Sequence, residues 1–150
     1  KVAISNTAKI LDTSKYDVFS QGAGRVDAYA AANPSALAYA IDEAVLDSSG
    51  AIVENLKGTV TFGPQSLRSG NISVTKEILV KDIKGIGGNY NVSVDVVKGF
   101  GDATITVDKS SFTLNGEELL TVTLTASQNT ATKLGDEMLG YINEFVKAIK

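Results

Sequence analysis

The sequence of 150 residues contains no histidine and no cysteine. A Ser-His-Asp triad uses an imidazole as its proton shuttle, so these 150 residues cannot hold a complete triad. Without cysteine there is no disulfide, no zinc thiolate and no thiol nucleophile. We therefore expect no catalytic residues, no cofactor-binding residues and no metal ligands of these kinds in this chain.

Long apolar runs and a strong charge of one sign are also missing. No run approaches the roughly 18 apolar residues of a membrane-spanning helix, so we expect no membrane span. The 14 Lys and Arg are spread along the chain and are outnumbered by 17 Asp and Glu, which gives a net charge of −3. Nucleic acid is not an expected partner, because phosphate backbones are bound by basic patches. No signal peptide is visible, and the start at Lys1 suits an excised fragment or a processed product.

The composition is that of a folded domain. Hydrophobic residues make up 43% of the chain, which excludes a disordered polymer. Residues 1–35 differ from the rest, because they are rich in Ala, Ser and Asn. Within them, residues 26–32 are predicted to form a short helix, with Asp27 in its first turn and Asn33-Pro34 ending it.

Residues 36–56 have two interpretations. Leu37, Ile41 and Val45 lie at helical spacing, but residues 47–50 (Asp-Ser-Ser-Gly) form a strong turn signal between two apolar runs. We favour a β-hairpin with arms at 38–46 and 51–55, and a helix is the alternative.

Most of residues 57–150 show the period-two alternation of strands with one buried face. The alternation is clearest over residues 72–81, 90–96 and 120–126. Glycine-containing turns lie at 85–88, 99–101 and 115–116. Short strands separated by such turns predict a mainly β chain that folds as an antiparallel β-sandwich.

Few residues suggest chemistry. The glycines at 22, 24 and 85–88 lack the Lys-Ser/Thr pair of a phosphate loop, so we interpret them as turn formers. Neighbours on a strand point to opposite faces, so adjacent carboxylates are predicted to be solvated surface charge. These pairs are Asp42-Glu43, Glu117-Glu118 and Asp136-Glu137.

A calcium site is the one cofactor hypothesis. Carboxylates and loop carbonyls are the ligands that calcium prefers. The candidates are Asp12 with Asp17, or the loop at Asp102, although no loop has the EF-hand spacing. Our expectation is otherwise that the chain holds no cofactor.

Two stretches resemble a known family. Asn6-Thr7-Ala8, followed by SQGAGRVDAYAAANP at 20–34, resembles the closing segment of the catalytic domain in subtilisin-like serine proteases. The resemblance implies that residues 1–35 are the end of an α/β catalytic domain, a short helical remnant. The nucleophilic serine of that family would then lie before Lys1, so none of its catalytic residues falls in this sequence.

The second stretch is GTVTFGPQS at 58–66, followed by SVTKEILVKD. It resembles the start of the fibronectin type III-like domain that follows the catalytic domain in large secreted and cell-envelope bacterial subtilases. The resemblance implies a sandwich over residues 36–150, with a closing strand at 138–146. Periodicity alone favours a helix there, since Leu134, Met138, Ile142 and Phe145 lie at helical spacing.

Together these observations predict a function without catalysis. The chain is expected to be a non-catalytic C-terminal region of a secreted, extracellular or cell-envelope serine endopeptidase. In that role it would stabilise the protease or shape substrate access, with its own catalytic domain as partner. The alternative is a β-sandwich module that binds a protein substrate or the cell wall.

Overall fold

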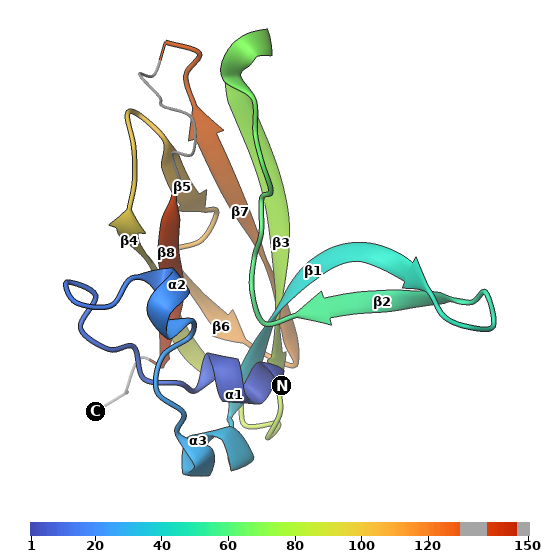
Figure 1. Cartoon of the computed structure of the whole chain (residues 1–150). Coiled ribbons are helices and arrows are strands. Elements are labelled where there is room, and N and C mark those ends of the chain that lie inside the picture. The colour runs from blue at the N-terminus through green and yellow to red at the C-terminus, as the bar shows by residue number, and fades with distance from the viewer. Residues whose placement is uncertain (130–137, 147–150) are drawn as a thin grey trace.

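The computed structural model describes residues 1–129 and 138–146 (Figure 1). This part of the chain is mainly β, with short helices near its N-terminus. The elements in chain order are α1 (Val2–Asn6), α2 (Val18–Gln21), α3 (Ala28–Ala32), β1 (Ala36–Leu46), β2 (Ile52–Lys57), η1 (Leu67–Ser69), β3 (Ile72–Asp82), β4 (Gly88–Lys98), β5 (Thr104–Val107), β6 (Ser111–Leu114), β7 (Glu117–Ala126) and β8 (Leu139–Val146). None of the helices in these ranges is both long and apolar enough to cross a membrane.

The strands form two antiparallel sheets, an arrangement consistent with the predicted β-sandwich. One sheet has five strands in the order β2-β1-β3-β7-β5, and the other has three in the order β6-β4-β8 (Figure 1). The longest continuous pairing joins β3 to β7, from Ile72 opposite Ala126 to Lys81 opposite Glu117.

Both sheets contribute to one apolar core. Its buried members are Ile78 and Val80 of β3, Leu120 and Val122 of β7, Tyr90 of β4 and Leu114 of β6. The apolar positions of the predicted alternation are buried or half-buried except Val96, which is 49% exposed, and the threonines between them on β7 are half-buried. The three strands predicted from period-two alternation are confirmed as β3, β4 and β7.

The predicted hairpin is confirmed, and the helical alternative for residues 36–56 is wrong. β1 and β2 pair antiparallel, with Leu46 opposite Ile52. The Asp47 side chain fixes the turn, because its Oδ1 accepts hydrogen bonds from Ser49 N (2.8 Å) and Ala51 N (3.0 Å). Apolar residues at helical spacing could not outweigh this turn, which lets β1 pair along β3.

At the C-terminus, the helix favoured by periodicity is wrong over the described residues, and the strand is confirmed. β8 pairs with β4, placing Gly140 opposite Val96. A Cβ on Gly140 would lie 2.3 Å from the Asp95 carbonyl oxygen, so only glycine allows this close approach. Leu134 and Asp136-Glu137 lie outside the described residues.

The predicted helix at 26–32 is shorter than expected and begins at Ala28. Asp27 precedes the first turn as N-cap, because its backbone is extended (φ −111°, ψ 95°) and its Oδ1 accepts a hydrogen bond from Ala30 N at 3.0 Å. The last helical residue is Ala32, just before Asn33-Pro34 as predicted.

Hydrogen bonds attach residues 1–35 to the sheets at separate points. Asn6 Oδ1 accepts from Ala38 N at 2.7 Å, and Tyr141 Oη donates to Gly22 O at 2.8 Å. The carbonyl of Ser35 accepts from Ile83 N at 2.9 Å. The segment is thus joined to the sheets by polar contacts at three points, and its three helices contain no buried residue.

Replacing Leu120 by alanine tests the core. Leu120 is 0% exposed, so Leu120→Ala should lower the free energy of unfolding by about 2–5 kcal/mol. Its neighbour Leu119 is 41% exposed, and Leu119→Ala should cost about 1 kcal/mol or less. Urea unfolding of both variants measures the difference, and equal losses would contradict this description of the core.

Candidate functional site

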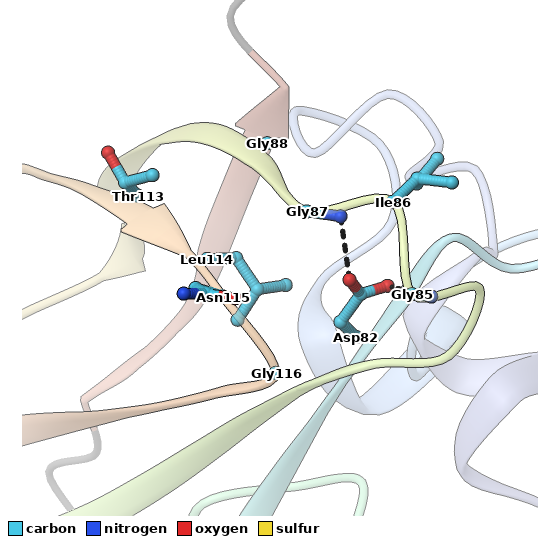
Figure 2. A pocket seen from close by; sticks show the side chains of 9 residues that line it. All are labelled: Asp82, Gly85, Ile86, Gly87, Gly88, Thr113, Leu114, Asn115 and Gly116. Carbon is cyan, nitrogen blue, oxygen red and sulfur yellow. Dashed lines mark hydrogen bonds between the residues drawn. The ribbon is translucent and has the colours of Figure 1, made fainter.

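The glycine-rich bend between β3 and β4 surrounds a carboxylate of the chain itself (Figure 2). The Asp82 side chain accepts hydrogen bonds from Gly87 N at 2.6 Å, Gly85 N at 2.8 Å and Lys84 N at 3.1 Å. These backbone donors, that of Gly87 foremost, hold the pKa of Asp82 below its ordinary value. The bend thus resembles an anion-binding loop in which the bound anion is the chain's own Asp82 carboxylate.

The conformation of this bend explains its glycines. Gly85 and Gly87 have φ values of 68° and 62°, in the left-handed region. A Cβ on Gly87 would lie 2.8 Å from the Leu114 carbonyl oxygen. The interpretation of these glycines as turn formers is confirmed. Together with the β6–β7 turn they line an open hollow. The bend is joined to that turn by a hydrogen bond from Asp82 N to Gly116 O of 2.7 Å.

The QGAG turn at 21–24 likewise has a structural explanation. Gly24 has φ 108°, and a Cβ there would lie 2.3 Å from the Lys9 carbonyl oxygen. This approach lets Lys9 and Arg25 exchange two backbone hydrogen bonds of 2.9 Å. Gln21 adds a second attachment, since its Oε1 accepts from Leu11 N at 2.7 Å and its Nε2 donates to Tyr16 O at 2.7 Å.

The loop held by the QGAG turn lies against the β4–β8 sheet. Together they line a second open hollow, formed by Ile10, Thr13, Ser14, Asp95, Val96, Val97 and Tyr141. Burial, with a smaller contribution from Asp17, raises the pKa of Tyr141, and its phenol donates to Gly22 O. Ser14 Oγ lies 2.6 Å from Asp12 Oδ1. No imidazole can stand between them, because the sequence has none.

The calcium candidates carry local structural roles. Asp12 Oδ1 accepts from Ser14 N at 3.0 Å, Asp17 Oδ1 caps α2 by accepting from Ser20 N at 2.7 Å, and Asp102 Oδ1 accepts from Ser127 N at 3.0 Å. Among the residues that the structure describes, no three acidic side chains gather as a metal site would require. Calcium binding stays a prediction.

Three of the adjacent carboxylates within the described residues, Asp42, Glu117 and Glu118, take part in ion pairs. Asp42 pairs with Lys57 Nζ at 2.5 Å and lies 3.8 Å from Lys76 Nζ. Glu117 pairs with Lys81 at 3.2 Å, and Glu118 pairs with Lys109. Exposed ion pairs of this kind contribute little to stability and do not form an acid–base pair.

The surface that sequence reasoning missed is apolar. In residues 1–35, Phe19 is 69% exposed, Val26 is 60% exposed and Tyr29 is 81% exposed. A second group lies at the end of the β1–β2 hairpin, where Leu46 and Ile52 are exposed. Periodicity could not identify these residues, because it does not show what covers a strand or helix face. The apolar side chains left exposed on these two segments are candidates for contact with a partner.

The Asp82 contacts predict a dependence on pH. A carboxyl group whose folded pKa is depressed stabilises the fold above its unfolded pKa of about 3.9, and this stabilisation is lost as the pH falls through the folded pKa. Asp82→Asn should therefore destabilise the protein at pH 7 and reduce the loss of stability in acid. Urea unfolding at pH 7 and at low pH measures both effects. The control is Glu54→Gln, which removes an exposed carboxylate from β2; an equal response in the two variants would contradict this role for Asp82.

The chain was compared with known proteins. No protein-family model matches it, and no curated protein matches it either. Its function is therefore inferred from its residues and their geometry.

Proposed function

We propose that the chain is the non-catalytic C-terminal region of a secreted subtilisin-like serine endopeptidase. In this proposal residues 1–35 are the end of the catalytic domain, and residues 36–150 are a fibronectin type III-like sandwich that stabilises that domain or shapes access to it. The observation that carries the proposal is the exposed apolar surface of residues 1–35, with Phe19, Val26 and Tyr29 uncovered on a segment that also contains the QGAG turn.

The energetics of this segment support its origin in a larger domain. Helices of four or five residues are marginal by themselves, and those of residues 1–35 contain no buried side chain. Burying the exposed apolar surface would stabilise the segment by about 25 cal/mol per Å² removed from water. The rest of a catalytic domain would cover Phe19 and Tyr29 and supply this missing stabilisation.

The contacts between the segment and the sheets support a stabilising role. Asn6, Gly22 and Ser35 are bonded to β1, β8 and the β3–β4 connection respectively. The sandwich thus holds the segment at positions spread along its length. Restricting the last part of a catalytic domain in this way opposes its local unfolding. The proposal includes an extracellular or cell-envelope location and requires no cofactor.

A binding module is the second candidate. The exposed Leu46 and Ile52 favour it, because they lie on a hairpin that extends beyond the sheet (Figure 1). Such a module would engage a protein substrate or the cell wall. Retention of the purified chain on peptidoglycan or on a substrate protein, compared with an unrelated β-sandwich, tests this candidate.

Turnover of casein tests the proposal directly. The purified 150-residue chain should release no peptides, because it contains no histidine to activate a serine. The longer protein in which the proposal places it (the parent) should cleave casein, and a serine-directed inhibitor should abolish the cleavage. Cleavage by the 150-residue chain itself would contradict the proposal.

Tyr141→Phe tests the stabilising role. The variant keeps the ring and removes the hydrogen bond to Gly22 O, which should cost about 0.5–1.5 kcal/mol. In the parent it should shorten the half-life of activity at elevated temperature while leaving initial activity unchanged. Tyr16→Phe is the control, since Tyr16 is exposed and its described hydrogen bonds use its backbone N–H and carbonyl. Equal half-lives for the two variants would count against the role of the sandwich.

A further inference from the structure

The β1–β2 hairpin extends past the sheet that it starts from. β1 pairs with β3 only as far as Ile41, which lies opposite Glu77. Residues 42–55, here named the hairpin arm, continue beyond that point and project from the body of the molecule (Figure 1). A register shift between Asp42 and Val45 marks a bulge at the base of the arm, where bulges commonly redirect a strand.

The end of the hairpin arm is apolar on both faces. Val45 lies opposite Val53, and Leu46 lies opposite Ile52. Because successive residues of a strand point to opposite faces, these two pairs lie on different sides of the arm. All four side chains are exposed, Ile52 to 78%. A flat partner would cover one pair only, so the arm fits a cleft that contacts both sides.

Hydrogen bonds and an ion pair brace the hairpin arm at its base and at its tip. At its base Asn55 Nδ2 donates to Glu43 O at 3.1 Å, and Lys57 pairs with Asp42. At its tip Asp47 N donates to Ala51 O at 2.9 Å, and the Asp47 side chain accepts from Ser49 and Ala51. A hairpin held in this way loses little conformational entropy on binding, which favours affinity.

The charge of the hairpin arm restricts its partner. Residues 42–55 contain Asp42, Glu43, Asp47 and Glu54 and no lysine or arginine, and the Asp42 carboxylate pairs with Lys57. The other three carboxylates oppose contact with a second copy of the arm, with anionic lipid and with an anionic polymer. Their complement is a cleft with apolar walls and Lys or Arg side chains at its rim.

The root of the hairpin arm adjoins α1. Asn6 is bonded to Ala38 of β1, and a Cβ on Gly58, just after β2, would lie 3.4 Å from Ser5 Cβ. Under the proposed function, on which this inference rests, α1 belongs to the catalytic domain. We propose that the hairpin arm inserts into an apolar, basic-rimmed cleft of that catalytic domain and fixes the sandwich against it.

Cysteine labelling tests this insertion, because the sequence contains no cysteine of its own. Ile52→Cys places a thiol on the arm, and Ser69→Cys places a control thiol in η1, which adjoins the end of β3 opposite to the end paired with β1. A water-soluble maleimide should modify both thiols rapidly in the 150-residue chain. In the active parent, labelling at position 52 should slow by about tenfold or more, while labelling at position 69 should not change.

The outcomes separate this inference from the proposed function. Equal labelling at position 52 in the chain and in a parent that cleaves casein overturns the inference alone. A parent without protease activity overturns the proposed function and the inference with it. Labelling at position 52 that is slow in the 150-residue chain and becomes faster on dilution would show that the arm binds a second copy of the chain. This result also overturns the inference.

A double variant gives a second readout. The variant carries Leu46→Thr and Ile52→Thr together. Threonine favours strands, so the hairpin should be retained while two exposed apolar side chains are removed. The melting temperature of the 150-residue chain should not change, whereas that of the parent should fall. A parent that melts at the same temperature as before contradicts the insertion.

Discussion

The pairing of β3 with β7, and the packing of this pair on Tyr90 and Leu114, supports the rest of the structure. β1 joins the free edge of β3, and β5 joins the free edge of β7. The opposite sheet is held by the same side chains, since Tyr90 and Leu114 belong to the core that Val80 and Leu120 form. Stacking of Tyr90 on Phe112, with ring centroids 5.4 Å apart, extends the packing to the β4–β6 pair.

Residues 1–35 depend on this core without contributing to it. They bury none of their helical residues, and polar contacts such as those of Asn6 and Tyr141 hold them in place. The hairpin arm is similar, because it is braced internally and has exposed apolar side chains. Two uncovered apolar groups, both attached to one well-packed body, are consistent with a body that serves to position a neighbouring domain.

The sequence was sufficient to predict structure wherever local rules act. Alternation at β3, β4 and β7 follows from burial of one face, and the hairpin follows from its Asp-Ser-Ser-Gly turn. The C-terminal strand could not be derived from periodicity, because it depends on Gly140 meeting Asp95, a contact between distant parts of the chain. Asp82 was missed for the same reason, since its backbone donors assemble only when the bend closes. The exposure of Phe19 and Ile52 depends on which other segments cover them, and a local sequence pattern does not encode that.

The central claim is that the QGAG-containing segment completes a catalytic domain whose reactive residues precede it. Sequencing the coding region upstream of Lys1 tests this claim most directly. The account predicts a serine in a G-T-S-M-A type motif shortly before Asn6-Thr7-Ala8, with the histidine and the aspartate of the triad farther upstream. An upstream region without that serine motif would contradict it.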